Sequence, residues 1–152
     1  RSSSSAASDV YKRQVLKSIR SFSSGNIICI FGCGGERDKG KRPNMGRIAE
    51  KFSNKLIITN DNPRLEDPNK IKEDITKGIS KVSKTHFIPD RKEAIQFGLK
   101  LLKKSKKGST LLIAGKGHEN YQEMKDKRIY FSDKNAIEEI INVSWKKAFK
   151  DC

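Results

Sequence analysis

The chain has 152 residues and a formal net charge of +15. This length suits one compact domain with a hydrophobic core, and the basic charge favours anionic partners such as nucleotides, phosphorylated metabolites or nucleic acid. No apolar run approaches the roughly 18 residues that a membrane span needs, so we expect neither a spanning segment nor a membrane partner.

The first 14 residues differ from the rest of the chain. They are rich in serine and lack periodicity, and residues 4–14 read like the translation of a sequencing-library adapter. We therefore predict that residues 1–14 are a disordered artefact outside the fold, as a cloning scar would be. The alternative is a natural disordered N-terminus. Removing this segment lowers the net charge by two, because it carries three basic residues and one acidic residue.

From residue 15 onwards, short apolar runs alternate with segments of helical periodicity. The apolar runs predict four strands, at residues 27–31, 56–59, 85–88 and 110–114. The periodic segments predict helices at residues 15–22, 44–52, 68–79, 91–102 and 133–141, with a helical tail from about residue 142. Asp67, directly before a proline, is expected to cap the start of the third helix. Residues 128–131 (RIYF) predict an edge strand.

Strands that alternate with helices predict an α/β fold, with a Rossmann-like, mostly parallel sheet and helices on both faces. Ligands of such sheets bind outside the carboxyl ends of the strands. Three polar loops directly follow a predicted strand, at residues 32–43, 60–67 and 115–122. We expect all three loops to lie at one edge of the sheet, around one crevice.

The glycine-rich loop after the first strand resembles two nucleotide-binding patterns without completing either. Residues 35–41 fit G-x-x-x-x-G-K, but an arginine follows where a Walker loop has Ser or Thr. The start of a dinucleotide fingerprint also fails, because its third glycine is replaced by arginine. Glycine amides beside basic side chains still suit an anion, although a simple chain turn is the alternative. The basic side chains are Arg37, Lys39, Lys41 and Arg42.

Residues 61–64 (DNPR) combine an acid, an amide, a rigid turn residue and a guanidinium. Pro63 fixes its own backbone and restricts Asn62 to extended geometry, so the neighbouring side chains lose little entropy on binding. Arg64 can hold a carboxylate through two hydrogen bonds, and Asp61 and Asn62 can accept from an ammonium group. The alternative is an ordinary Asx-Pro turn with a surface arginine.

The loop after the fourth strand, residues 115–122, carries His118 and Glu119 behind two glycines. Glu119 can accept an ammonium group from across the crevice, opposite Arg64. We expect His118 to form hydrogen bonds or stack rather than act as a base, since no metal-ligand spacing surrounds it. A cation that faces an anion in this way predicts a binding site for an amino acid.

The cysteines argue against a disulfide framework and a zinc site. Their number is odd, and Cys29, Cys33 and Cys152 show no C-x-x-C spacing. We therefore predict no metal site in this chain and a reducing compartment.

Taken together, the segments GCGGERDKGKRPNMG, TNDNPR, AGKGHENYQ and YFSD closely resemble the C-terminal domain of the Mur ligase family, in its diaminopimelate-adding branch. The resemblance runs from about residue 15 to about residue 141 and implies one such domain over residues 15–152. It implies no catalytic residue in this chain. From their position beside Arg37, we hypothesise that Lys39, Lys41 or Arg42 stabilises the transferred phosphate. The residues that the resemblance implies for diaminopimelate binding are Arg37, Asp61, Asn62, Pro63, Arg64, Gly115 and Glu119.

The resemblance implies an ATP-dependent ligase that adds meso-diaminopimelate to UDP-MurNAc-L-Ala-D-Glu in peptidoglycan synthesis, and so serves the cell wall, cell shape and cell division. ATP and Mg²⁺ would be held mainly by a central domain upstream, which is absent here, so we expect this chain alone to be inactive. The implied protein is a monomer without nucleic-acid partners, in the cytoplasm, or in a plastid if the source is a plant or alga.

Two other functions remain open on the sequence. One is a noncatalytic ligand-binding or scaffold domain, as in plastid homologues of this ligase. The other is a basic nucleic-acid-binding module, which would need neither the DNPR loop nor the GKGHE loop. The lysines are scattered over helical segments with few aromatic residues between them, a pattern more typical of a solvated surface.

Overall fold

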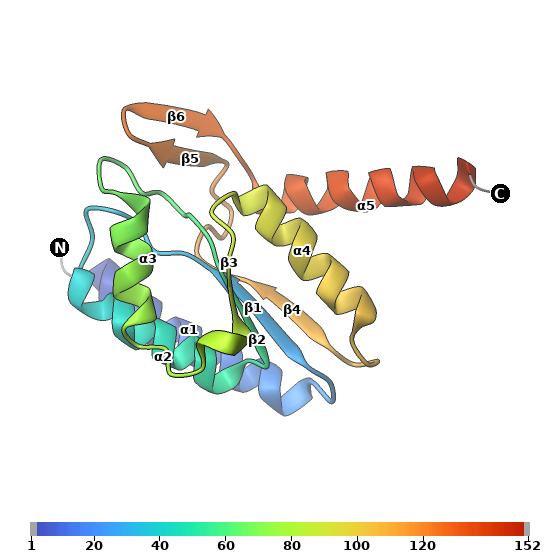
Figure 1. Cartoon of the computed structure of the whole chain (residues 1–152), viewed down its shortest axis with the longest axis horizontal. Coiled ribbons are helices and arrows are strands. Elements are labelled where there is room, and N and C mark those ends of the chain that lie inside the picture. The colour runs from blue at the N-terminus through green and yellow to red at the C-terminus, as the bar shows by residue number, and fades with distance from the viewer. Residues whose placement is uncertain (1–2, 151–152) are drawn as a thin grey trace.

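The computed structural model describes residues 3–150 of the chain (Figure 1). Cys152 and the first two residues of the predicted artefact therefore lie outside the described residues. The helices are α1 (Ser3–Phe22), α2 (Arg42–Phe52), α3 (Pro68–Thr76), α4 (Arg91–Lys104) and α5 (Asp133–Lys150), and two 3₁₀ turns span Lys39–Lys41 and Val82–Lys84. The strands are β1 (Ile27–Phe31), β2 (Lys55–Ile58), β3 (Thr85–Phe87), β4 (Thr110–Ile113), β5 (Tyr121–Met124) and β6 (Lys127–Tyr130).

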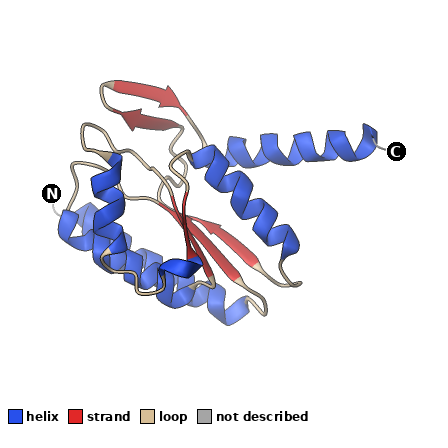
Figure 2. Ribbon diagram, in the orientation of Figure 1, coloured by secondary structure: helices blue, strands red, loops and turns tan. Residues whose placement is uncertain are grey.

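Four strands form one parallel sheet in the order β3-β2-β1-β4 (Figure 2). All five residues of the inner strand β1 are buried, as expected for an apolar strand covered on both faces. The predicted α/β class, with its mostly parallel sheet, is confirmed.

Helices cover both faces of the sheet (Figure 1). Side chains of α1, α2 and α3 pack with Cys29 and Phe31 on one face, and side chains of α4 and α5 pack with Ile28 and Ile30 on the other. Successive residues of β1 thus serve opposite cores, because side chains alternate along a strand. Each fully buried isoleucine contributes about 1.5–3 kcal/mol of transfer free energy, so these two layers supply most of the driving force for folding.

The helix starts follow the expected capping chemistry. Asp67 accepts a hydrogen bond from the Asn69 amide at 2.9 Å, and Asp90 accepts one from the Glu93 amide at 2.9 Å. Helix α3 ends at Thr76, three residues earlier than predicted, although Ile79 still packs into the core. No helix within residues 3–150 is long and apolar enough to cross a membrane.

The expectation of disorder over residues 1–14 is wrong for the described part of that segment. Residues 3–14 continue the first helix without a break. Lys12 is buried, and its ammonium lies 3.7 Å from the centre of the Phe31 ring, so this end of α1 packs on the sheet. The origin of the segment as an adapter artefact stays a prediction.

The predicted edge strand belongs to a separate hairpin. Strand β6 pairs with β5 in an antiparallel two-stranded sheet and makes no ladder with β1–β4. The predicted loop at residues 115–122 includes the first two residues of β5 (YQEM), a strand with only one apolar residue apart from its tyrosine. Helix α5 follows the hairpin and includes the predicted tail from residue 142, and its far end projects away from the sheet (Figure 1).

Candidate functional site

The loops after β1 and β2 pack directly against each other. The Gly35 amide donates to the carbonyl oxygen of Asn62 at 2.8 Å. A Cβ atom on Gly35 would lie 1.9 Å from the carbonyl oxygen of Pro63, so only glycine fits there. This contact brings the glycine-rich loop beside the DNPR loop, as the parallel sheet predicts.

Asn62 joins the DNPR loop to the segments that follow β4. Its side chain is buried, and Oδ1 accepts hydrogen bonds from Lys116 Nζ and from the Glu123 amide, both at 3.0 Å. Its Nδ2 donates to Glu119 Oε2 at 3.2 Å. With its donors and acceptors taken up in this way, Asn62 positions the loop rather than presenting a free group to a ligand.

Lys116 lies at the centre of the predicted site, and sequence reasoning missed it. Its side chain is 0% exposed, and Nζ donates to the carbonyl oxygen of Tyr121 at 2.6 Å. The same ammonium lies 3.5 Å from Asp61 Oδ1 and 3.8 Å from Glu119 Oε2. A lysine between two glycines predicts an exposed turn, so only the fold reveals this contact. We call Asp61, Asn62, Arg64, Lys116 and Glu119 the clamp.

Arg64 occupies the other side of the DNPR loop and is held by the hairpin. Its Nη1 donates to the Gly35 carbonyl at 2.9 Å, and its Nε lies 3.0 Å from Glu123 Oε2. Its backbone N–H donates to the Glu123 carbonyl at 3.1 Å, and its carbonyl accepts from the Lys125 amide at 2.6 Å. These two bonds hold Arg64 at a φ of +53°. Among the described residues, Nη2 of Arg64 has no hydrogen-bond partner. The guanidinium is therefore fixed with one nitrogen left to bind a ligand oxygen.

Glu123 carries the charge that orients Arg64. The hydrogen bond from Arg128, at 2.6 Å, lowers the pKa of Glu123 below its ordinary value, and the charge of Arg64 lowers this pKa further. The carboxylate is therefore ionised at neutral pH and bridges two arginines. Sequence patterns do not reveal this role, because they do not predict the hairpin that places Glu123.

Arg37 and Gly115 lie beside the clamp. A Cβ atom on Gly34 would lie 3.1 Å from Arg64 Nη1 and 3.4 Å from Arg37 Cγ, so both predicted carboxylate-binding arginines border the same glycine. Gly115 has a φ of +119°, and a Cβ atom there would lie 3.6 Å from Asp61 Oδ2. The structure thus brings the predicted amino-acid-binding residues to one edge of the sheet.

Arg42 differs from the other predicted phosphate-stabilising residues. It is 1% exposed and forms two hydrogen bonds with the carboxylate of Glu66, at 2.7 and 2.8 Å, and a third with Asp74 at 3.1 Å. Hydrogen bonds from Arg42 lower the pKa of Glu66 to about 2. Lys39 is 65% exposed and lies 3.5 Å from Glu66. Lys39 and the half-buried Lys41 are therefore the members of this group that reach solvent.

A second buried arginine ties together the strand ends beneath the clamp. Arg91 bonds to Asp133 through Nε and Nη2, at 2.7 and 2.8 Å. It also donates to the carbonyl oxygens of Ala114 at 3.1 Å and Asn60 at 3.4 Å. Ala114 directly follows β4, and Asn60 lies two residues after the end of β2, so this pair fixes the spacing between the DNPR and GKGHE loops.

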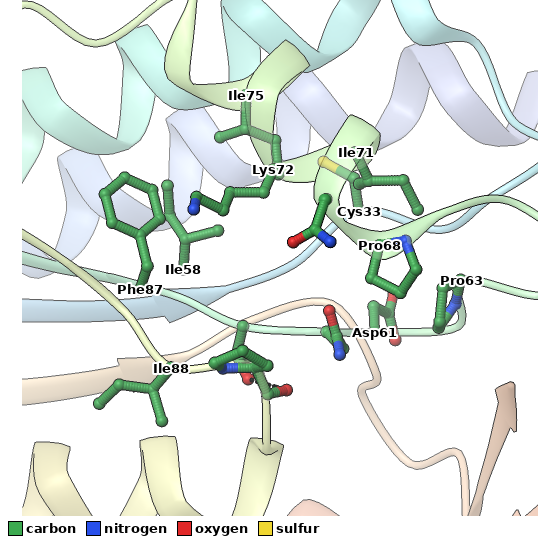
Figure 3. Close-up of a pocket in the computed structure, with 14 residues that line it drawn as sticks. Cys33, Ile58, Asp61, Pro63, Pro68, Ile71, Lys72, Ile75, Phe87 and Ile88 are labelled. Atoms are coloured by element: carbon green, nitrogen blue, oxygen red, sulfur yellow. Dashed lines mark hydrogen bonds between the residues drawn. The ribbon is translucent and has the colours of Figure 1, made fainter.

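A small cavity of about 50 Å³ lies behind the DNPR loop, between α3 and the ends of β2 and β3 (Figure 3). Its walls are mainly apolar, with Ile58, Ile71 and Phe87 among them, and Asp61 and Pro63 lie at one side. Arg64, Gly115 and Glu119 do not line it. The cavity therefore meets the clamp only at Asp61.

Cys29 and Cys33 are both buried and neither forms a disulfide within residues 3–150, and burial raises the pKa of Cys29 to about 11. Within residues 3–150, no group of His, Cys, Asp and Glu side chains is arranged to hold a metal ion.

The chain matches the family model described as "Mur ligase, glutamate ligase domain" over residues 6–117. It is 48% identical over 124 residues to the UDP-N-acetylmuramoyl-L-alanyl-D-glutamate–2,6-diaminopimelate ligase of Prochlorococcus marinus strain NATL1A, covering 82% of this chain and 24% of that relative. Ligase 1 of the same description from Clostridium acetobutylicum is 48% identical over 128 residues, which are 84% of this chain and 26% of the relative.

A solved structure with the same ligase description superposes with a TM-score of 0.82 at 40% sequence identity. The match covers 90% of this chain and 28% of that structure. The chain thus spans about a quarter of the length of the relatives that it matches. Sequence and structure agree that this chain belongs to the Mur ligase family, as its C-terminal glutamate ligase domain.

Proposed function

We propose that this chain is the amino-acid-binding domain of an ATP-dependent ligase that adds meso-diaminopimelate to UDP-MurNAc-L-Ala-D-Glu in peptidoglycan synthesis. The observation that carries the proposal is the clamp itself. A fixed guanidinium, Arg64, and two carboxylates, Asp61 and Glu119, border one edge of the sheet, in loops that Asn62 holds together. The names of the relatives support diaminopimelate as the amino acid.

The charges of the clamp suit one end of diaminopimelate. The ligand carries an ammonium and a carboxylate at each of its two amino-acid centres. Arg64 suits a carboxylate, because its remaining nitrogen, Nη2, can donate a charge-assisted hydrogen bond, and Arg37 lies beside it. Asp61 and Glu119 suit the ammonium of the same centre. Gly115 leaves space next to Asp61, since it has no side chain. The other amine is then left to react.

In the proposed reaction, ATP phosphorylates the terminal D-glutamate carboxylate of the nucleotide substrate. The free amine of diaminopimelate attacks the acyl phosphate carbon, an amide C–N bond forms, and phosphate leaves as the C–O bond breaks. The residues of this chain hold the amine in position for that attack. Exposed Lys39 and half-buried Lys41 are suited to the departing phosphate, whereas buried Arg42 is suited to supporting the loop that carries them.

Among the described residues, no group of three or more His, Cys, Asp and Glu side chains could hold a metal ion. We assign Mg²⁺ and the binding of ATP to parts of the longer protein outside this chain. We accordingly expect the isolated chain to lack ligase activity, which an assay for ADP with all substrates present would check. We also propose a monomer without nucleic-acid partners, in the cytoplasm or a plastid.

Calorimetry with two amino acids tests the proposed substrate. Titration of the chain with meso-diaminopimelate should give tighter binding than titration with L-lysine, which has no carboxylate for the clamp when its α-amine is the amine left free to react. Arg64→Ala should remove most of that difference, because it deletes the carboxylate-binding guanidinium. Arg47→Ala, at an exposed arginine on α2, is the matched control and should behave like the unaltered chain. Equal affinity for the two amino acids in the unaltered chain would contradict the proposal.

A further inference from the structure

The contacts of Lys116 point to a role that the proposed ligand set does not include. Its ammonium is the cation that faces both carboxylates of the clamp, at 3.5 Å from Asp61 Oδ1 and 3.8 Å from Glu119 Oε2. Arg91 Nη2 also borders Gly115, as Asp61 Oδ2 does, but the charge of Arg91 is balanced by Asp133. The two carboxylates are therefore held next to one buried internal cation.

We propose that Lys116 is a positioning residue that cancels one of the two negative charges of Asp61 and Glu119, so that the pair accepts one ligand ammonium rather than two. This inference rests on the proposed function, because it concerns how the same clamp selects its ligand. It assigns to Lys116 no contact with the substrate and no step in the reaction.

The burial of Lys116 supports a fixed role. Its side chain has no exposed surface, and hydrogen bonds to Asn62 Oδ1 and to the Tyr121 carbonyl hold the ammonium from two sides. A buried charge of this kind is maintained only when it is paired and hydrogen-bonded. Lys116 is thus part of the folded site and does not sample solvent as a surface lysine would.

The charge balance has a consequence for selectivity. Two carboxylates and one internal ammonium leave a net charge of −1, which one ligand ammonium neutralises. Without Lys116 the same carboxylates carry −2, which favours a ligand with two cationic groups and no carboxylate. Lys116 thus adds to the preference for a zwitterionic centre such as that of diaminopimelate, whose carboxylate is assigned to Arg64.

The first test compares two ligands on the 152-residue chain by NMR titration. We expect Lys116→Met to weaken binding of meso-diaminopimelate and to strengthen binding of 1,5-diaminopentane. The ratio of the two affinities should change by about tenfold or more, the effect that one charge has at about 4–6 Å. Lys107→Met removes the same charge at an exposed residue before β4 and should leave the ratio unchanged. A purely structural role would instead weaken both ligands together, and that result would overturn the proposal.

A second test needs no ligand and separates this proposal from the proposed function. Asp61→Asn should lower the thermal midpoint of the unaltered chain, where it removes a partner of Lys116. The same change should raise the midpoint in the Lys116→Met chain, where it relieves repulsion between carboxylates. Lys116→Gln, which keeps a hydrogen-bond donor, serves as the neutral background if the methionine variant does not fold. Equal shifts in both backgrounds would overturn the role of Lys116, whereas absence of any diaminopimelate binding in the unaltered chain would overturn only the proposed function.

Discussion

At the centre of the sheet, the five residues of β1 are apolar and buried, whereas at the carboxyl edge the buried side chains include Arg42, Arg91 and Lys116. Apolar burial is non-directional and scales with area, so the centre tolerates small changes of shape. A buried charge needs a specific partner at a specific distance, so each change at the edge leaves another charge uncompensated. The centre therefore supplies most of the stability, and the edge sets the geometry of the clamp.

The largest expected effect is at the edge. Arg91→Met should lower the free energy of unfolding by about 3–5 kcal/mol, because the Asp133 carboxylate stays buried without its partner. Urea denaturation followed by circular dichroism measures this loss. Lys92→Met is the matched control, since it breaks the pair with Glu139 between the same two helices, but both of those side chains are more than half exposed. That control should cost no more than about 1 kcal/mol, and equal losses would contradict the comparison.

Acid should reduce the stability that ion pairs at the carboxyl edge contribute, whereas the apolar centre of the sheet has no charge to titrate. The pKa of Glu66 is lowered from 4.5 to about 2 by hydrogen bonds from Arg42. A depressed folded-state pKa gives stability that is present above the unfolded value and is lost as the pH falls through the folded value. The contribution of Glu66, up to about 3 kcal/mol, should therefore be complete above about pH 4.5 and disappear towards pH 2.

Glu66→Gln should accordingly flatten the dependence of unfolding free energy on pH between these two limits. Glu36→Gln, at an exposed residue in the same region, is the control and should keep the slope of the unaltered chain. An unchanged slope in the Glu66 variant would show that the Arg42 pair does not couple to folding.

An added methyl group between two loops should disturb binding and stability together. In Gly35→Ala the new Cβ atom would lie 1.9 Å from the carbonyl oxygen of Pro63, so one of the two loops must move. We expect a loss of about 1–3 kcal/mol in unfolding free energy, together with weaker binding of meso-diaminopimelate. Gly40→Ala in the same segment is the control, because its nearest neighbour is a side-chain oxygen of Asp38 at 3.2 Å. If Gly35→Ala binds the ligand normally, the two loops do not act as one unit.

A small change at the centre should have the smallest effect and should leave binding intact. Ile57 is fully buried in β2, and Ile57→Val removes one methylene group. We expect a loss of about 0.5–1.5 kcal/mol in unfolding free energy and an unchanged affinity for meso-diaminopimelate. Parallel denaturation and calorimetry on this variant check both statements. A loss of affinity here would show that the centre also tunes the clamp.

The contrast between the apolar centre and the charged edge also explains which parts of the fold and the site can be predicted from the sequence. The bounds of β1 are predicted correctly, because a continuous apolar run between glycines has few other structures available. The DNPR and GKGHE loops are correctly placed at one edge, since that follows from parallel strands. Strand β5 has too few apolar residues to be predicted, and its place is set by pairing with β6 and by backbone bonds between the hairpin and Arg64, which is distant in sequence.

Buried charges are the other limit of sequence reasoning. Arg42 stands among basic loop residues and was predicted to stabilise phosphate, yet Glu66 and Asp74, 24 and 32 residues away, enclose it. The burial of Lys116 is equally invisible, because its partners come from the DNPR loop and the hairpin. Such contacts are fixed by tertiary structure, which local patterns do not encode.

The central claim, that the clamp is the amino-acid-binding site, is tested most directly by mapping bound meso-diaminopimelate on the chain with two-dimensional NMR. The account predicts that backbone signals of residues 61–64 and 115–119 move on titration, with smaller changes at residues 121–124 of the hairpin. Signals of α3 around the apolar cavity should stay in place. Movement confined to α3, or no movement at residues 61–64 and 115–119 at saturating ligand, would contradict the claim.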